Sequence, residues 1–339
     1  MHGAGQQPAR KLQLTQSSSS VTPIIEHQQI ADFADARVNL PYDKVREFRD
    51  RVNSLRDSLE ANIAADPGYA IVRTLHSGSV AKGTALRTVN DFDLAVYLKQ
   101  DQVPADDRLL GSWLIARLKE ARPQLADDQF VPEAHCATIV YRDGTKVDVV
   151  PVLDVGDGSA DGYLIEKDTG LRILTNIRRH LEFIRVRKER VPVHFRQVVR
   201  LVKFWVRLQK MIDADLRFKS FLVELLCAHL LDQGVDMSDY AEALGAFFEY
   251  VVRSGLRETV VFDDYYDGSA VTVAKGVITV IDPVNPSNNV TADYTEQGRK
   301  RIVDAAQAAL DAIDYATYAP TKGEAVAAWR EVLGTGFQG

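Results

Sequence analysis

The run DFDLAVYL at residues 91–98 places two carboxylates at the start of an otherwise apolar segment. Successive side chains of a β-strand point to opposite faces, so Asp91 and Asp93 share one face while Phe92 and Leu94 occupy the other. A carboxylate removed from water costs several kcal/mol unless a positive group meets it. The segment therefore predicts a strand that buries one face and presents a chemical site on the other.

A third carboxylate interrupts a second apolar run, KVDVVPV, at residues 146–152. This run follows Asp143-Gly144, a strong hairpin signal, so ATIVYRDGTKVDVVPVL predicts two antiparallel strands, with Asp148 in the second. Carboxylates on neighbouring strands are the ligands that two hard cations, Mg²⁺ or Mn²⁺, require, because clustered negative charges need an offsetting positive one. Taken alone, Asp91 or Asp93 also fits a strand-end cap or an ion-pair partner.

The loop GSVAKGT, residues 78–84, precedes the first pair of acids. Its glycines let backbone N–H groups approach an anion closely, and Ser79 adds a hydroxyl. Lys82 stands before the second glycine, whereas a Walker A motif has its lysine after it, which disfavours an ordinary P-loop ATPase. The loop predicts a cradle for phosphate groups.

The composition limits the classes of partner. A net charge of -6 over 339 residues argues against a nucleic-acid coat or a membrane-surface protein, so an anion site needs a local concentration of Lys and Arg. No apolar run reaches membrane-spanning length. The only cysteines, Cys136 and Cys227, lack metal-ligand spacing, which disfavours a zinc site and fits a reducing compartment. We expect a cytoplasmic protein.

The order of patterns along the chain predicts two lobes. Residues 1–20, rich in Gln, Ser and Gly, have the composition of a disordered leader. Residues 21–160 read as a mixed α/β lobe, with a long helix after Pro41. Residues 161–330 read as a mainly helical lobe, with helices around 176–190, 194–213, 218–232, 238–254 and 296–313. The last segment, residues 331–339, is small and Gly-rich, so we expect a flexible tail.

A cationic stripe follows one face of the helix that begins near residue 194. Its members recur at spacings of four, three, four and three, and they are Arg196, Arg200, Lys203, Arg207 and Lys210. A solvated helix face is the simpler interpretation of Arg207 and Lys210. A net-acidic protein that binds a polyanion nevertheless needs such charges.

Together, GSVAKGTALRTVNDFDLAVYL and KVDVVPVL resemble the Gly-Ser, Asp-x-Asp and distal Asp signature of the polymerase-β-like nucleotidyltransferases. The segments RLVKFWVR (200–207), KSFLVELL (219–226) and VIDPVNPSNNV (280–290) resemble those of the oligoadenylate synthases and their bacterial relatives, the cGAS/DncV-like nucleotidyltransferases (CD-NTases) of antiphage signalling. The resemblance implies an α/β nucleotidyltransferase lobe, with a mixed sheet and helices, followed by a mainly helical lobe. No Cys/His insertion resembles the zinc element of the animal DNA sensor, so direct sensing of duplex DNA is not expected.

By this resemblance, Asp91 and Asp93 bind two Mg²⁺ or Mn²⁺ ions, and Asp148 completes one metal site and helps to deprotonate the acceptor hydroxyl. Gly78 and Ser79 grip the donor triphosphate.

The resemblance also assigns residues of the helical lobe to the nucleotide. Lys203 falls at the family's triphosphate-contacting lysine, Ser220 joins the nucleotide-binding set, and Phe221 falls where the family presents a ring to a nucleobase. Phe221 equally fits an apolar helix face. Asn288 and Asn289 are candidates for reading a base edge, yet NPSNNV is also good turn chemistry.

The implied function is metal-dependent transfer of NMP units from NTPs, with ATP as the expected substrate, to give a cyclic di- or trinucleotide second messenger. A linear 2'-5' oligoadenylate synthase and an RNA 3'-end nucleotidyltransferase are the alternative enzymes, although the second would expect a basic RNA-binding tail. A nucleotide-binding scaffold is the alternative without activity, and the three intact aspartates argue against it. The resemblance also permits a HORMA-type activator or a ubiquitin-transfer-like partner at the C-terminal tail.

Overall fold

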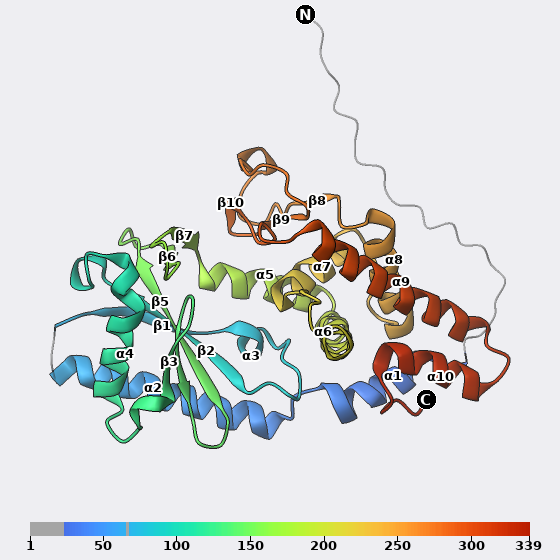
Figure 1. Cartoon of the computed structure of the whole chain (residues 1–339), viewed down its shortest axis with the longest axis horizontal. Helices are drawn as coiled ribbons and strands as arrows, with labels where there is room; N and C mark the ends of the chain where they lie inside the picture. The colour runs from blue at the N-terminus through green and yellow to red at the C-terminus, as the bar shows by residue number, and fades with distance from the viewer. Residues whose placement is uncertain (1–23, 66–67) are drawn as a thin grey trace, which may run out of the picture.

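The computed structural model describes residues 24–65 and 68–339, and Figure 1 shows a sheet-containing lobe beside a helical lobe. The leader expected at residues 1–20 lies outside the described residues. The two lobes have separate hydrophobic cores, one between the large sheet and its helices and one among the helices of the second lobe. The expected division into an α/β lobe and a mainly helical lobe is confirmed.

The large sheet has the order β1-β2-β5-β4-β3, with β6 paired to β5 and β7 paired to β6. Its strands are β1 Ile71–Ser77, β2 Asp91–Leu98, β3 Phe130–Pro132, β4 Ala137–Val140, β5 Lys146–Asp154, β6 Gly162–Ile165 and β7 Arg172–Thr175. The expected hairpin is present, since β4 and β5 are antiparallel, and β2 lies parallel to β5 on its other side. The central pair β2 and β5 therefore brings both acidic runs together.

Two helices, α2 Tyr42–Ala65 and α4 Leu110–Ala121, cover one face of this sheet (Figure 1). The apolar stripe of α2, including Leu55 and Leu59, packs with Phe92 and Leu94 of β2 in one core. Because this face of β2 is buried in the core, functional side chains can lie only on its opposite face. That face is flanked by the short helix α3 Gly78–Lys82.

The helical lobe is built around α6 and α7. Trp205 of α6 packs against Phe218, which precedes α7, and against Phe248 of α8. Its helices are α1 His27–Phe33, α5 Ile177–Arg190, α6 His194–Ile212, α7 Ser220–Asp232, α8 Tyr240–Ser254, α9 Glu296–Tyr318 and α10 Lys322–Leu333. A small sheet contains β8 Thr259–Val260, β9 Thr279–Asp282 and β10 Asn285–Asn289. Short helical turns occur at Ala34–Val38, Gln100–Gln102, Asp107–Leu109, Asp127–Gln129 and Gly268–Ala270. Within the described residues, no helix combines the length and the apolar character needed to cross a membrane.

The lobe boundary differs from the one expected at residue 160. Strands β6 and β7 extend the large sheet as far as Thr175, because Gly162 and Tyr163 pair with the chain that returns after residue 170. At the other end, α1 belongs to the helical lobe, since Ile30 and Phe33 are buried in its core. The chain therefore starts in the helical lobe, builds the sheet lobe and then returns.

The expected flexible tail at residues 331–339 is wrong. Helix α10 continues to Leu333, and Phe337 beyond it is fully buried, with its ring 5.5 Å from that of Phe33. Arg330 Nε donates a hydrogen bond of 2.8 Å to the Phe337 carbonyl oxygen. The Phe337 ring packs against Phe33 of α1 and Trp329 of α10, so the small residues around it form a tight turn rather than a loose end. Figure 1 shows the C-terminus beside these two helices.

Candidate active site

The pairing of β2 with β5 sets the three candidate aspartates on adjacent strands. Asp93 stands opposite Asp148 in the parallel register, and Asp91 lies two residues earlier on the same face of β2. The alternate residues Phe92 and Leu94 are buried in the core beneath. This is the arrangement that the alternation of DFDLAVYL predicts.

Asp93 and Asp148 are partly removed from water and repel one another, whereas Asp91 is exposed. Burial, followed by the charges of Asp148 and Asp91, raises the pKa of Asp93 to about 6. Burial also raises the pKa of Asp148, against the hydroxyl of Thr138, which donates a 2.6 Å hydrogen bond to Asp148 Oδ1. Among the described residues, no group of three or more Asp, Glu, His or Cys side chains is arranged so that it could hold a metal ion. The negative charge and the oxygen atoms of the three aspartates therefore suit hard cations, but the side chains are not arranged as a finished metal site.

The short helix α3 holds Gly78 and Ser79 close to these aspartates. Gly78 has a φ of +67°, and a Cβ built there would lie 1.6 Å from Asp93 Oδ2, so only glycine fits. Gly83 ends the helix with a φ of +73°, and the Thr84 N–H donates a 2.9 Å hydrogen bond back to the Ser79 carbonyl oxygen. The loop is thus fixed with its N-terminal end beside Asp93.

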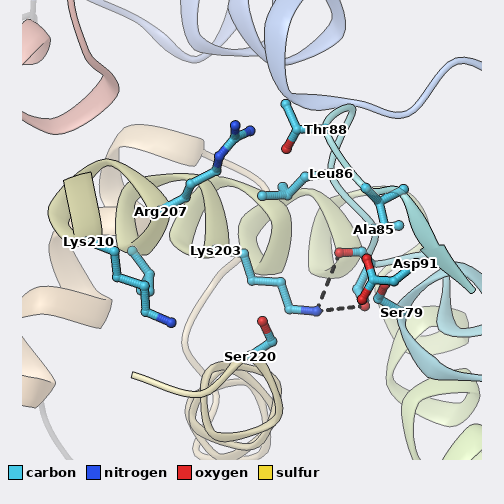
Figure 2. A pocket seen from close by; sticks show the side chains of 12 residues that line it. Ser79, Ala85, Leu86, Thr88, Asp91, Lys203, Arg207, Lys210 and Ser220 are labelled. Carbon is cyan, nitrogen blue, oxygen red and sulfur yellow. Dashed lines mark hydrogen bonds between the residues drawn. The ribbon is translucent and has the colours of Figure 1, made fainter. Parts of the chain in front are cut away.

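A cavity of about 360 Å³ opens beside this loop. Its polar lining comes from α3, β2, α6 and α7, and it includes Ser79, Asp91, Lys203, Arg207, Lys210 and Ser220. Figure 2 shows Lys203 and Ser220 approaching Ser79 and Asp91 from the helical lobe. The structure therefore brings three of the residues expected at the nucleotide, Ser79, Lys203 and Ser220, together with Asp91, an expected metal ligand.

Lys203 itself is buried and already paired. Its Nζ donates hydrogen bonds of 2.6 Å to Glu224 Oε1 and 3.0 Å to Thr84 Oγ1. Lys82 Nζ donates to the other oxygen, Glu224 Oε2, at 2.8 Å. Burial would raise the pKa of Glu224, but the two ammonium groups hold it at about 2. Two lysines thus share one carboxylate beneath the cavity, and burial lowers the pKa of the Lys203 ammonium group.

Glu224 is a site residue that the sequence reasoning missed. The signal was available, because Glu224 is the one acid in the apolar run FLVELLCAHLL of residues 221–231. A buried acid in an apolar helix needs a cationic partner, just as Asp148 does in its strand. The same argument predicts a cationic partner for Glu224, although it does not identify that partner as Lys82 or Lys203.

Phe221 faces a second, larger cavity of about 530 Å³, with apolar walls that include Leu164 and Ile177. Lys82 Nζ lies 4.7 Å from the centre of its ring, and the His180 ring meets its edge at 5.5 Å. His180 Nε2 is 2.8 Å from Asp282 Oδ1. The ring of Phe221 is therefore half-buried at a cavity wall, where a planar group can stack.

The two asparagines differ in their surroundings. Asn288 lines the second cavity and donates a 3.1 Å hydrogen bond to Asp282 Oδ2. The side chain of Asn289 is buried, with its Oδ1 accepting from the Val280 N–H and its Nδ2 donating to the Ile278 carbonyl oxygen, each at 3.1 Å. Asn289 also lines this cavity, but its buried amide ties the end of β10 to the start of β9, and its assignment to a base edge stays a prediction.

Comparison with known proteins places this site in a family. Residues 25–169 match the model of the SMODS domain, the Second Messenger Oligonucleotide or Dinucleotide Synthetase domain. The chain is 46% identical over 319 residues to a cyclic AMP-AMP-AMP synthase of Escherichia coli strain MS 115-1, covering 94% of this chain and 99% of that relative.

Solved structures agree with this relationship. The E. coli MS115-1 CdnC structure with ATP superimposes with a TM-score of 0.87 at 46% identity, covering 93% of this chain and 100% of that one. Its complex with HORMA-deltaN superimposes with a TM-score of 0.86 at the same identity, covering 93% and 99%. The chain therefore belongs to the CD-NTases, the polymerase-β-like nucleotidyltransferases that synthesise cyclic oligonucleotide second messengers.

Proposed function

We propose that this enzyme links AMP units from ATP into a cyclic oligoadenylate, with the three-membered ring as its main product. The observation that carries this proposal is the placement of Asp93 opposite Asp148 on one strand face, beside the Gly78-Ser79 loop. Near-complete coverage of a relative described as a cyclic AMP-AMP-AMP synthase supports the choice of base and ring size. The proposed division of labour among the residues follows from their contacts.

Asp91 and Asp93 would hold two divalent metal ions, and Asp148 would complete one of the two sites. When bound, such ions activate an attacking hydroxyl and stabilise the charge on the leaving oxygen. The protein's own contribution is orientation and proton transfer. Because Thr138 occupies Asp148 Oδ1 with a 2.6 Å hydrogen bond, Asp148 Oδ2 is the oxygen that we assign to the proton of the acceptor hydroxyl.

The donor triphosphate would lie in the first cavity, where Ser79 and Ser220 offer hydroxyl groups. Lys203 shares its charge with Glu224, so it supplies only part of the positive charge that a triphosphate needs. Arg207 and Lys210 are exposed at the same cavity and form no ion pair among the described residues. We therefore assign them to the phosphates as well, in place of the solvated face that the sequence alone favoured.

Cyclisation requires the first intermediate to place its own 5' triphosphate in the donor cavity. Its free hydroxyl is then the nearest acceptor, and the high effective concentration favours ring closure over further extension. Phe221 suits successive occupants, because stacking on an aromatic ring accepts any base. Selection of adenine would fall to polar groups of the second cavity, among them His180 and Asn288.

The product identifies the function. We would incubate the purified protein with Mg²⁺ and labelled ATP, with and without its activating partner, and treat the product with phosphatase before mass spectrometry. A cyclic triadenylate resists phosphatase and carries no terminal phosphate. A ladder of dephosphorylated linear oligomers would instead establish the oligoadenylate-type alternative. Asp93→Asn serves as the inactive control, and the exposed Asp101→Asn is its matched active counterpart.

We also infer that a HORMA-type partner regulates the enzyme, because the E. coli relative has been solved in a complex with HORMA-deltaN. The burial of Phe337 argues against attachment of a partner through a mobile C-terminal tail. Mixing the chain with its cognate HORMA protein should give a stable complex in size-exclusion chromatography. Failure to form that complex, or a complex without effect on ATP turnover, would contradict this inference.

A further inference from the structure

A third cavity, of about 350 Å³, adjoins the first one at Ala85, behind helix α3. Four helices from both lobes supply its charged lining, which we call the basic pocket and which consists of Arg49, Lys82, Lys188, Arg196 and Arg200. No acidic residue is part of this lining in the described chain. Five cations around one hollow are unusual in a protein of net charge -6, so they need a specific explanation.

The positive charges of this pocket are poorly compensated from within. Only Lys82 has an ion-pair partner among the described residues, the shared carboxylate of Glu224. The Nε atom of Arg196 is buried and makes no hydrogen bond there. Burial, followed by the charge of Arg196, lowers the pKa of Arg200 to about 10. An anion in the hollow would relieve this repulsion and supply the missing acceptor.

We propose that the basic pocket binds a compact polyphosphate group, separately from the donor nucleotide. Three guanidinium groups favour phosphate, because their planar forks donate two parallel hydrogen bonds to its oxygens. The cations surround a partly open hollow and do not form a flat stripe, which favours a small ligand over a duplex. Tyr42, with 80% of its surface exposed, stands at the rim, where a ring can stack on a base.

Hydrogen bonds to one peptide group connect this pocket to the active site. Arg200 donates hydrogen bonds of 3.0 and 2.8 Å from Nε and Nη2 to the carbonyl oxygen of Gly83, the residue that ends α3. The Arg196 guanidinium lies against the same glycine, with Nη1 3.0 Å from the position of a Cβ. A ligand that draws on these two arginines therefore acts on the loop that presents Ser79 to the donor cavity.

Isothermal titration with inorganic tripolyphosphate tests the proposal directly. The pocket variant is Lys188→Glu/Arg196→Glu. The matched variant is Arg207→Glu/Lys210→Glu, which reverses two charges at the first cavity, both on α6, the helix of Arg196. We expect the pocket variant to weaken the tightest binding event roughly tenfold or more, and the matched variant to retain it. Tighter binding of ATP than of tripolyphosphate to the matched variant would identify the ligand as a nucleotide, whereas equal or weaker binding would identify a base-free polyphosphate.

Three results would overturn the proposal. They are an absence of tripolyphosphate binding to the wild-type protein, an equal loss in both variants, and a loss confined to the matched variant. A duplex of about 40 base pairs that binds in place of tripolyphosphate, and is lost in the pocket variant, would make this a nucleic-acid surface instead. Should the charge reversals prevent folding, as judged by circular dichroism, Arg49→Ala/Lys188→Ala replaces them. Because binding is measured without turnover, failure here leaves the proposed synthase activity standing.

Discussion

Glu224→Gln is the substitution that tests the buried network most sharply. Each carboxylate oxygen of Glu224 accepts a hydrogen bond from a lysine, Lys203 at 2.6 Å and Lys82 at 2.8 Å. The glutamine keeps the shape but removes the charge, so two ammonium groups, one of them buried, are left facing a neutral amide. We expect strong destabilisation, because an isolated buried charge costs more than the intact pair is worth.

The structure sets the size of the effect. Burial opposes ionisation of Glu224, yet the two lysines hold its pKa at about 2, below the ordinary value of 4.5. Since one pKa unit corresponds to about 1.4 kcal/mol, this difference is worth about 3 kcal/mol. Removing one partner of a buried ion pair typically costs about 3–5 kcal/mol. Glu224→Gln should therefore lower the free energy of unfolding by about 3–4 kcal/mol at neutral pH.

Urea unfolding at several pH values is the appropriate assay. The pKa of Glu224 is lower in the folded than in the unfolded chain, so its stabilising contribution is complete above about pH 5 and disappears as the pH falls toward 2. The wild-type and Glu224→Gln proteins should differ by about 3 kcal/mol at pH 7 and by only about 1 kcal/mol at pH 3.

The exposed Glu249→Gln on α8 is the matched control, because Glu249 forms no ion pair within the described chain and should lose almost nothing. A loss below about 1 kcal/mol for Glu224→Gln, or a loss that is the same at pH 7 and pH 3, would refute the reasoning. Adding Lys203→Met to Glu224→Gln should cost less than the sum of the two single changes, because it removes the buried ammonium group that the glutamine leaves unpaired.

Further predictions concern the reaction and the packing of the chain. Asp93→Asn should abolish ATP consumption without lowering the melting temperature, since it removes a proposed metal ligand and relieves repulsion; chelation by EDTA should stop turnover of the wild type, and added Mg²⁺ or Mn²⁺ should restore it. Gly78→Ala should also inactivate the enzyme, because its Cβ would occupy the place of the Asp93 carboxylate, and unchanged turnover would contradict the loop geometry. Phe337→Ala should lower the free energy of unfolding by about 3–5 kcal/mol in urea, whereas a mobile tail would make it neutral.

Local sequence patterns were sufficient to predict the helices and strands and the strand face that carries the aspartates. The alternation in DFDLAVYL and the turn at Asp143-Gly144 depend on neighbours only a few residues away, so they predict β2, β4 and β5 without tertiary information. The same holds for α6, whose stripe of cations is periodic. The convergence of Asp93 and Asp148 followed from one additional assumption, that the two acidic runs pair in the same sheet.

Long-range partners were beyond those patterns. Nothing near Lys203 in the sequence indicates that its ammonium group pairs with Glu224, 21 residues later, or donates a hydrogen bond to Thr84, 119 residues earlier. Phe337 was assigned to a loose tail because its glycine-rich surroundings predict mobility, whereas its burial depends on α1 at the opposite end of the chain. The side chain of Asn289 likewise bonds outside its own turn, since its amide joins the end of β10 to Ile278 and Val280.

The cations of α6 are evenly spaced along one stripe, yet they line two separate cavities. The chain that follows α3 crosses the helix between these cavities, at Gly83 and Thr84. Arg196 and Arg200 lie on one side of that crossing, in the basic pocket, while Arg207 and Lys210 line the donor cavity on the other. A charge in one cavity therefore changes the electrostatic potential in the other, because only a few helical turns of poorly hydrated interior separate them. An anion that neutralises the basic pocket would lower the positive potential at the donor cavity but also hold α3 in place. Opposed effects on ATP affinity and on turnover are thus the expected signature of a ligand at that pocket.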